Sequence, residues 1–277
     1  MALRQPVPAA PRDVIQFFRA LADEPRLAII RLLVVGDLRS GEIGERLLLP
    51  ANALAYHLKR LRALGLLSNR RSSADARDVY HHLDLERLST LYAQAGDLLH
   101  PGIFSSATSA SGSPQSQASE EAVERTMTAR PLRVLFLCTH NSARSQLAEG
   151  ILRQMGGDRV EVYSAGSMPT QVDAEVLAML RELGADPAGH YAKSMDRFRG
   201  ESFDYVITVC DRVREICPTF AGDPAQAHWS FPDPLELDDP DQRHRLLRTI
   251  VRELQTRIRY LLQLPHPATG ERLSPRP

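Results

Sequence analysis

The sequence contains a cysteine at the end of an apolar run, followed six and seven positions later by an arginine and a serine. The stretch reads VLFLCTHNSARSQLAEG, and it places Cys138 before a short polar segment that leads to Arg144 and Ser145. A thiolate is a strong nucleophile, and an arginine presents a planar fork of donors that suits tetrahedral oxyanions. The pattern C-x5-R-S therefore predicts a nucleophilic thiolate in a loop that binds a phosphate-like anion.

A strand and a helix are predicted to position this thiol. Residues 132–138 are almost all apolar, which is typical of a buried parallel strand, and residues 144–156 have helical periodicity. The N-terminus of a helix favours negative charge, so we expect it to lower the pKa of Cys138. We also expect Ser145 to donate a hydrogen bond to the sulfur, and Asn141 to adopt positive φ. The predicted oxyanion-binding loop comprises Thr139, His140, Asn141, Ser142, Ala143 and Arg144.

This segment resembles the low-molecular-weight tyrosine phosphatase superfamily, which includes the thioredoxin-coupled arsenate reductases. The resemblance covers about residues 131–264. It implies a three-layer α/β domain with a four-stranded parallel sheet flanked by helices. The candidate strands are 132–138, 159–164, 204–210 and 226–231, and the candidate helices are 144–156, 173–184, 211–217 and 241–264.

An Asp-Pro pair on a late loop is the expected source of a general acid. The sequence FPDP contains Asp233, in the manner of the superfamily's Asp-Pro, and a carboxylic acid there can protonate a departing oxygen. Small tyrosine phosphatases follow this pair with aromatic residues that pack on the substrate ring. Here the next residues are Leu235, Glu236 and Leu237, so the wall of an aryl-phosphate pocket is missing. This difference favours the reductases.

Two further cysteines, Cys210 and Cys217, are seven residues apart in YVITVCDRVREICP. Two helical turns would put both on one face about 10 Å apart, beyond disulfide range, so a bond between them requires unwinding. Thioredoxin-coupled arsenate reductases have a thiol pair at this spacing. By this resemblance Cys138 attacks arsenate while Asp233 protonates the leaving hydroxyl, and the other two cysteines pass a disulfide outward. The expected reductant is an external dithiol such as thioredoxin, with no metal or other cofactor.

The first hundred residues are predicted to form helices followed by a hairpin. Apolar periodicity, capping residues and a polar tip support this order, which is that of a winged helix-turn-helix. The predicted helices are 9–21, 26–35, 41–48, 51–64 and 84–99, and the predicted strands are 66–71 and 79–83.

Four strings in this segment, LADEPRLAIIRLL, GEIGERL, ALAYHLKRLRALGLL and RDVYHHL, resemble the ArsR/SmtB family of repressors. The resemblance implies a helix-rich winged helix-turn-helix domain that forms a homodimer and binds operator DNA through the helix at 51–64. The segment contains no cysteine, so a thiol site for an inducer would have to lie elsewhere. The residues expected to contact DNA are Asn52, Tyr56, His57, Lys59 and Arg60 on the helix and Arg70, Arg71 and Arg77 in the wing.

An uncharged stretch, SSATSASGSPQSQAS, separates the two halves and is typical of a flexible linker. We therefore divide the chain into a DNA-binding domain at 1–101, a linker at 102–130 and a domain like arsenate reductases and small phosphatases at 131–277. The 277 residues are 43% hydrophobic and 25% charged with zero net charge, as in ordinary globular proteins. No apolar run is long enough for a membrane span or a signal peptide, so we expect a cytoplasmic protein.

Together these patterns favour an arsenate reductase fused to an ArsR-type regulator domain. Two alternatives stay open. One is a protein tyrosine phosphatase with a DNA-binding domain, and the other is a repressor whose phosphatase-like domain only senses an oxyanion or metalloid. No pattern identifies the inducer, the operator, the physiological reductant, communication between the domains or a role for His140.

Overall fold

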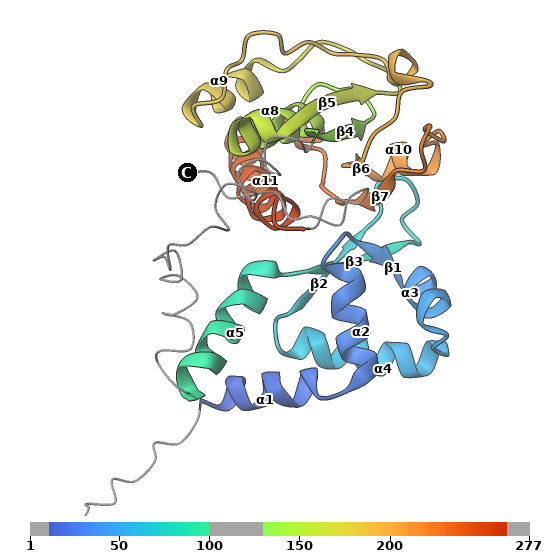
Figure 1. The fold of residues 1–277 in the computed structure, drawn as a ribbon, viewed down its shortest axis with the longest axis vertical. Coiled ribbons are helices and arrows are strands. Elements are labelled where there is room, and N and C mark those ends of the chain that lie inside the picture. Colours follow the sequence, from blue (N-terminus) through green and yellow to red (C-terminus); the bar gives the residue numbers. More distant parts are fainter. Residues whose placement is uncertain (1–10, 100–129, 265–277) are drawn as a thin grey trace, which may run out of the picture. The chain divides into compact units, whose positions relative to one another are not determined.

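The computed structural model describes residues 11–99 and 130–264, and Figure 1 shows their elements. The chain divides into two compact units, which are described separately. The predicted linker at 102–130 lies outside the described residues, apart from Arg130. Among the described residues, the first unit comprises 11–34, 39–69 and 81–99, and the second comprises 35–38, 70–80 and 130–264.

The second unit contains a sheet of four parallel strands in the order β5-β4-β6-β7, which confirms the predicted fold class of this half. In the registered pairs, Cys138 lies beside Gly166, and Thr208 lies beside His228. The carboxyl ends of the strands therefore meet at one edge, where ligands of parallel α/β sheets bind. The strands are β4 (Leu132–Cys138), β5 (Val160–Gly166), β6 (Tyr205–Thr208) and β7 (Ala225–His228).

Helices surround this sheet and bury its apolar strands. Helix α8 packs on β4 and β5 and against α9 and α11, and α10 contacts β4 and β6. Asp173 and Asp239 cap α9 and α11 by accepting backbone N–H hydrogen bonds. The helices are α8 (Arg144–Gly156), α9 (Ala174–Glu182), α10 (Asp211–Glu215) and α11 (Pro240–Leu261), with short 3-10 turns η1 (Gly157–Arg159), η2 (Met195–Phe198) and η3 (Pro234–Glu236).

Residues 11–99, the described part of the N-terminal half, have the predicted order of helices and hairpin. Asp23 caps α2 by accepting from the backbone N–H of Arg26, and the apolar faces of the helices enclose a core that includes Phe17, Ile29 and Leu61. The elements are α1 (Arg12–Leu21), α2 (Glu24–Leu33), β1 (Leu38–Arg39), α3 (Ser40–Leu47), α4 (Ala51–Ala63), β2 (Leu67–Arg71), β3 (Val79–Leu83) and α5 (Leu85–Leu99).

One strand of this half has no counterpart in the prediction. Strand β1 is two residues long and pairs with β3, which gives a three-stranded sheet in the order β1-β3-β2. Two residues are too few for alternation to show in a sequence, so this strand is defined only by its partner. No helix among residues 11–99 and 130–264 is long and apolar enough to cross a membrane.

Candidate active site

The predicted nucleophile lies in the strand–loop–helix arrangement that the sequence indicates. Cys138 ends β4, is 2% exposed, and is followed by a five-residue loop before α8 begins at Arg144. Its sulfur lies 2.9 Å from Ser145 Oγ and accepts a hydrogen bond of 3.1 Å from the Asn141 backbone N–H. The predicted contact of Ser145 with the thiol is therefore present.

Asn141 is the residue that fixes the shape of this loop. Its φ of 49° matches the predicted left-handed conformation. The side-chain amide donates to Ser145 Oγ at 2.9 Å and to Ser164 Oγ at 2.8 Å. The amide oxygen accepts from the Lys193 backbone N–H at 2.7 Å and from Gln146 Nε2 at 3.0 Å. With all these partners satisfied, the loop has little freedom to rearrange.

Gly166 at the end of β5 allows the loop to approach the sheet. A Cβ atom at this position would lie 2.6 Å from the Thr139 carbonyl oxygen and 2.9 Å from the Asn141 backbone nitrogen. Both distances are shorter than van der Waals contact, and both involve backbone atoms. A side chain at position 166 would therefore push the loop away from β5.

A buried ionic cluster lies next to the loop, and the sequence patterns do not predict it. Glu149 in α8 is buried, lies 3.2 Å from Lys193 Nζ, and also contacts Arg153 and Ser164. Ser164 in turn accepts a hydrogen bond from the Asn141 side chain, so the cluster helps to hold Asn141 and with it the anion loop. Its members are as many as 44 residues apart, and the only sequence signal is a carboxylate within an otherwise buried helix.

Arg144 and Asp233, the predicted anion donor and general acid, lie together. Arg144 is buried, donates to the Phe231 carbonyl at 3.1 Å through Nη1, and forms an ion pair with Asp233 through Nη2. Asp233 is the N-cap of η3, and its other oxygen accepts from the Leu235 backbone N–H at 3.1 Å. The site thus places a cation and a carboxyl group beside the buried thiol.

The expected lowering of the Cys138 pKa is not found. Burial raises the pKa of this thiol above its usual value, while Arg144, the Ser145 hydroxyl and the Asn141 N–H act in the opposite direction. Burial prevails because the sulfur is almost fully removed from solvent. The prediction of a lowered pKa is therefore wrong, and the thiol has to lose its proton as part of the reaction.

Cys210 lies at the same loop as Cys138. It is 1% exposed and precedes α10, and its sulfur is 3.3 Å from Thr139 Oγ1. Cys217 follows the end of α10, with its sulfur 3.8 Å from the Pro218 carbonyl oxygen. Burial raises the pKa of Cys217 to about 11. All three cysteines carry free thiols.

The predicted placement of Cys210 and Cys217 on one helix face is wrong, because α10 spans only Asp211–Glu215. The helix still separates the two cysteines. From the N-cap at Cys210 to the C-cap at Ile216 it rises about 9 Å at about 1.5 Å per residue. Disulfide-bonded residues have Cα atoms within about 7 Å, so a Cys210–Cys217 bond requires α10 to unwind.

The residues predicted to contact DNA have different environments. His57 is half-buried, with Nδ1 3.3 Å from Asp23 Oδ1, so it is less accessible than a residue that contacts DNA has to be. In the hairpin, Arg71 is exposed and Arg77 forms an exposed pair with Asp75, whereas Arg70 donates to Asp211. The remaining predicted residues are all exposed on α4 and comprise Asn52, Tyr56, Lys59 and Arg60.

The parallel sheet, the cysteine loop and the paired Arg144 and Asp233 define a class of enzymes that act on oxyanions through a cysteine nucleophile. Residues 133–268 match the family model of low molecular weight phosphotyrosine protein phosphatases. A relative named arsenate reductase, from Halalkalibacterium halodurans, is 32% identical over 46% of this chain and 91% of its own length. The chain belongs to this family, its C-terminal half is an enzyme domain, and its similar relatives include arsenate reductases.

Two other proteins show the same likeness. A glutaredoxin arsenate reductase from Synechocystis is 29% identical over 47% of this chain and 95% of its own length. The solved structure of a thioredoxin-dependent arsenate reductase from Corynebacterium glutamicum is 27% identical, with a TM-score of 0.38. That match covers 64% of this chain and 91% of the other. Among the described residues, no group of three or more His, Cys, Asp or Glu side chains is arranged to hold a metal ion.

Proposed function

We propose that this chain reduces arsenate to arsenite through a relay of Cys138, Cys210 and Cys217. The observation that carries the proposal is a second buried thiol at the anion loop, since the Cys210 sulfur contacts Thr139 in that loop. Hydrolysis of a phosphate ester through a cysteinyl intermediate uses only one thiol, whereas reduction of As(V) needs two electrons from two sulfur atoms. Relatives named arsenate reductases support the same choice.

The first step is attack of the Cys138 sulfur on arsenic. Arsenate has the charge and tetrahedral shape of the anion for which Arg144 and the N-terminus of α8 are suited. As the sulfur–arsenic bond forms, one arsenic–oxygen bond breaks. The Asp233 carboxylate takes up the proton that the Cys138 thiol loses and passes it to the departing oxygen, which leaves as water. The ion pair of Asp233 with Arg144 holds both groups at the site of this exchange.

The second step is attack of the Cys210 sulfur on Cys138. A sulfur–sulfur bond forms and the sulfur–arsenic bond breaks with its electron pair on arsenic, so As(V) becomes As(III) and the thiol proton passes to an oxygen of the product. Summed over both steps, arsenic acid and two thiols give arsenous acid, a disulfide and one water. Cys217 then attacks Cys210, Cys138 leaves as a thiolate, and an external dithiol such as thioredoxin reduces the Cys210–Cys217 disulfide.

An arsenate reduction assay with thioredoxin, thioredoxin reductase and NADPH tests this proposal. Cys138→Ser and Cys210→Ser should each abolish arsenate-dependent NADPH oxidation. Cys217→Ser should allow a single turnover and leave a Cys138–Cys210 disulfide that mass spectrometry detects. Multiple turnovers by the Cys210→Ser enzyme would contradict the relay.

The same assay separates the two alternatives that the sequence leaves open. A phosphatase would hydrolyse p-nitrophenyl phosphate with a catalytic efficiency at least comparable to that for arsenate, and this activity would survive Cys210→Ser. A repressor that only senses an oxyanion would show no turnover of either substrate. In the proposed reductase, arsenate turnover prevails and depends on all three thiols.

We propose as a second function that the N-terminal half binds operator DNA as an ArsR-type winged helix-turn-helix regulator. The exposed α4 residues Asn52, Tyr56, Lys59 and Arg60 offer amide, hydroxyl and cationic groups to bases and phosphates. Exposed apolar residues on α1 and α5, which pack together, support the expected homodimer; they are Ile15, Phe18, Tyr92 and Leu98. Both proposals place the protein in the cytoplasm, with DNA and reduced thioredoxin.

Fluorescence anisotropy with the upstream DNA of the chain's own coding region tests the second function. Lys59→Ala and Arg60→Ala should each weaken binding and reduce the slope of log K against log salt by about one. Arg31→Ala, an exposed arginine on α2, serves as the matched control. Light scattering measures the oligomeric state, and a monomer at micromolar concentration would contradict the expected dimer.

A further inference from the structure

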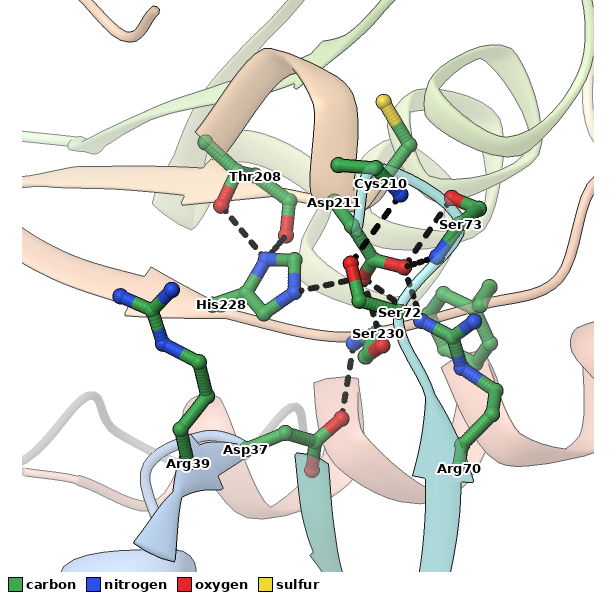
Figure 2. Close-up of polar contacts among 12 residues, drawn as sticks. Asp37, Arg39, Arg70, Ser72, Ser73, Thr208, Cys210, Asp211, His228 and Ser230 are labelled. Atoms are coloured by element: carbon green, nitrogen blue, oxygen red, sulfur yellow. Dashed lines mark hydrogen bonds and ion pairs between the residues drawn. The ribbon is translucent and has the colours of Figure 1, made fainter. Parts of the chain in front are cut away.

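A buried carboxylate that the proposed chemistry does not use lies directly after Cys210. Asp211 is fully buried, and a charge at such a position requires partners. Figure 2 shows its surroundings, which include residues of the segment Arg70–Tyr80. This segment comes from the N-terminal half of the sequence but belongs to the second compact unit.

Four side chains and one backbone N–H donate to this carboxylate. Arg70 Nη2 lies 2.6 Å from both of its oxygens, and Ser73 donates from its backbone N–H at 2.7 Å and its hydroxyl at 3.0 Å. The Ser230 hydroxyl donates at 2.8 Å, and His228 Nε2 lies at 3.0 Å. Four of these contacts are made by the two residues of the N-terminal segment, Arg70 and Ser73.

His228 links the two sides of Cys210. Asp211 can only accept, so His228 donates from Nε2, while its Nδ1 lies 2.8 Å from the Thr208 hydroxyl and 3.1 Å from the Thr208 carbonyl oxygen. Burial lowers the pKa of His228 and so favours the neutral ring, which with its proton on Nε2 accepts from the hydroxyl at Nδ1. Thr208 precedes Cys210 by two residues and Asp211 follows it, so one ring holds the backbone on both sides of the thiol.

The segment Arg70–Tyr80 also packs against His228 and α10 through the ring of Tyr80. The Tyr80 ring lies 4.8 Å from the His228 ring and 5.0 Å from the Arg214 guanidinium carbon in α10. Arg214 donates its backbone N–H to the Cys210 carbonyl at 3.4 Å. The segment thus contacts Cys210 through Asp211, through His228 and through the first turn of α10.

We propose that Arg70 and Ser73 are positioning residues for Cys210: through Asp211 they hold its thiol at the oxyanion loop for attack on Cys138. The inference rests on the proposed reductase function and assigns part of its machinery to a segment outside residues 133–268, which match the family model. The hydrogen-bond partners described above for Cys138, Arg144 and Asp233 do not include Arg70 or Ser73. The formation of the Cys138–Cys210 bond is therefore affected, and arsenate binding is not.

Single-turnover kinetics of the full chain in a Cys217→Ser background test this assignment. After mixing with excess arsenate, the sample is quenched by acid and alkylation, and the Cys138–Cys210 disulfide is quantified by mass spectrometry. In Arg70→Ala the saturating rate should fall about 10- to 100-fold, since misplacement by about 1 Å can have this effect. The arsenate concentration that gives half the maximal rate should stay within about twofold.

Milder variants keep the test informative if Arg70→Ala unfolds the protein because the Asp211 charge is left buried. Ser73→Ala removes the hydroxyl but keeps the backbone donor, and it should slow the disulfide step about two- to fivefold. Arg70→Lys should recover part of the rate lost in Arg70→Ala. Arg87→Ala, which removes an arginine from an exposed pair with Asp13, is the matched control and should leave the rate unchanged.

The outcomes separate this inference from the proposed function. If the Cys217→Ser protein forms no Cys138–Cys210 disulfide with arsenate, the reductase proposal itself is wrong. If it forms the disulfide and Arg70→Ala and Ser73→Ala form it equally fast, only the positioning role is overturned. An equal loss of rate and of arsenate affinity in these variants would indicate general structural damage and would also overturn the role.

Discussion

The surroundings of Cys138 and of Cys210 differ in how far along the sequence their partners lie. The sulfur of Cys138 is contacted by Asn141 and Ser145, both within seven residues of it. The residue next to Cys210 is held by Arg70, which is 141 positions away, and by Ser230 beyond β7. One thiol is positioned by its own loop, and the other by residues from distant parts of the chain.

This difference corresponds to the different tasks of the two thiols in the proposed relay. The anion loop has the same function in every turnover and gains from rigidity, which its closed hydrogen-bond network provides. The segment from Cys210 to Cys217 has to hold one thiol in place and then let α10 unwind. A helix of five residues that is held through the side chain of its first residue suits both tasks, because so short a helix has few backbone hydrogen bonds to break.

The largest effect is expected from a change within the loop. Arg144→Lys keeps the charge but loses the planar fork for the oxyanion, so kcat/KM for arsenate should fall about 10²- to 10³-fold. Steady-state kinetics with thioredoxin measure the loss. Arg199→Lys, at an exposed pair with Asp196, is the control. Activity close to wild type would show that this arginine does not act as a two-point anion donor.

A second expectation concerns Cys217, at the far end of the segment that begins at Cys210. In a Cys138→Ser/Cys210→Ser variant only Cys217 can be alkylated, and burial raises its pKa to about 11. At pH 8 iodoacetamide should therefore react about 10²-fold more slowly in the native protein than in urea, since the reactive thiolate is scarce. Equal rates in both conditions would mean that Cys217 is already exposed, and that α10 opens without oxidation.

The same contrast explains how much of the site the sequence could predict. The C-x5-R-S pattern identifies Cys138, Arg144 and Ser145 because local spacing fixes their geometry, and the positive φ of Asn141 follows from the same loop. The Asp211 anchor could not be predicted, since nothing in the spacing relates a hairpin arginine to a carboxylate 141 residues later. From its residue type alone, Arg70 is as well suited to contact a DNA phosphate as a carboxylate. Only the fold reveals that its partner is the carboxylate of Asp211.

The helices and strands were predicted more fully than the electrostatics. The resemblance to the small phosphatases implies the four parallel strands and the helices around them, and the predicted ends differ from the observed ones by up to three residues. The pKa of Cys138 was predicted in the wrong direction because sequence shows a helix N-terminus but not the extent of burial. The predicted helix at 211–217 is also two residues too long, since α10 ends at Glu215.

A smaller effect is expected where the loop meets the sheet. Gly166→Ala introduces a Cβ that would lie 2.6 Å from the Thr139 carbonyl oxygen, so the loop has to shift. We expect kcat/KM to fall about tenfold and stability to drop by about 1–3 kcal/mol, as in overpacked sites. Gly41→Ala, with open space around its Cβ, is the control for kinetics and urea unfolding. An unchanged kcat/KM would show that the loop can move without loss of function.

The smallest expected effects are changes of local stability with pH, and they should differ between the Cys138 loop and the Cys210 region. The lowered pKa of His228 means that the fold favours the neutral ring, so its contribution to stability is present above its usual pKa and is lost as the pH falls. The raised pKa of Cys138 favours the neutral thiol, so that contribution is present below its usual pKa and is lost as the pH rises. Acid should therefore loosen the Cys210 region, and alkali the Cys138 loop.

Local amide exchange is the suitable measurement, because His81 in the first unit also has its pKa lowered by burial, to about 4, and would dominate an acid melting curve. After correction for intrinsic exchange, amides of α10 should lose protection between pH 7 and pH 5, and amides of residues 139–143 between pH 8 and pH 10. The pKa of Asp211 is lowered despite its burial because His228, Arg70 and Ser73 donate to it, so it stays ionised at pH 5. His228→Gln should therefore remove the acid response of α10, and a response that persists would assign it to another group.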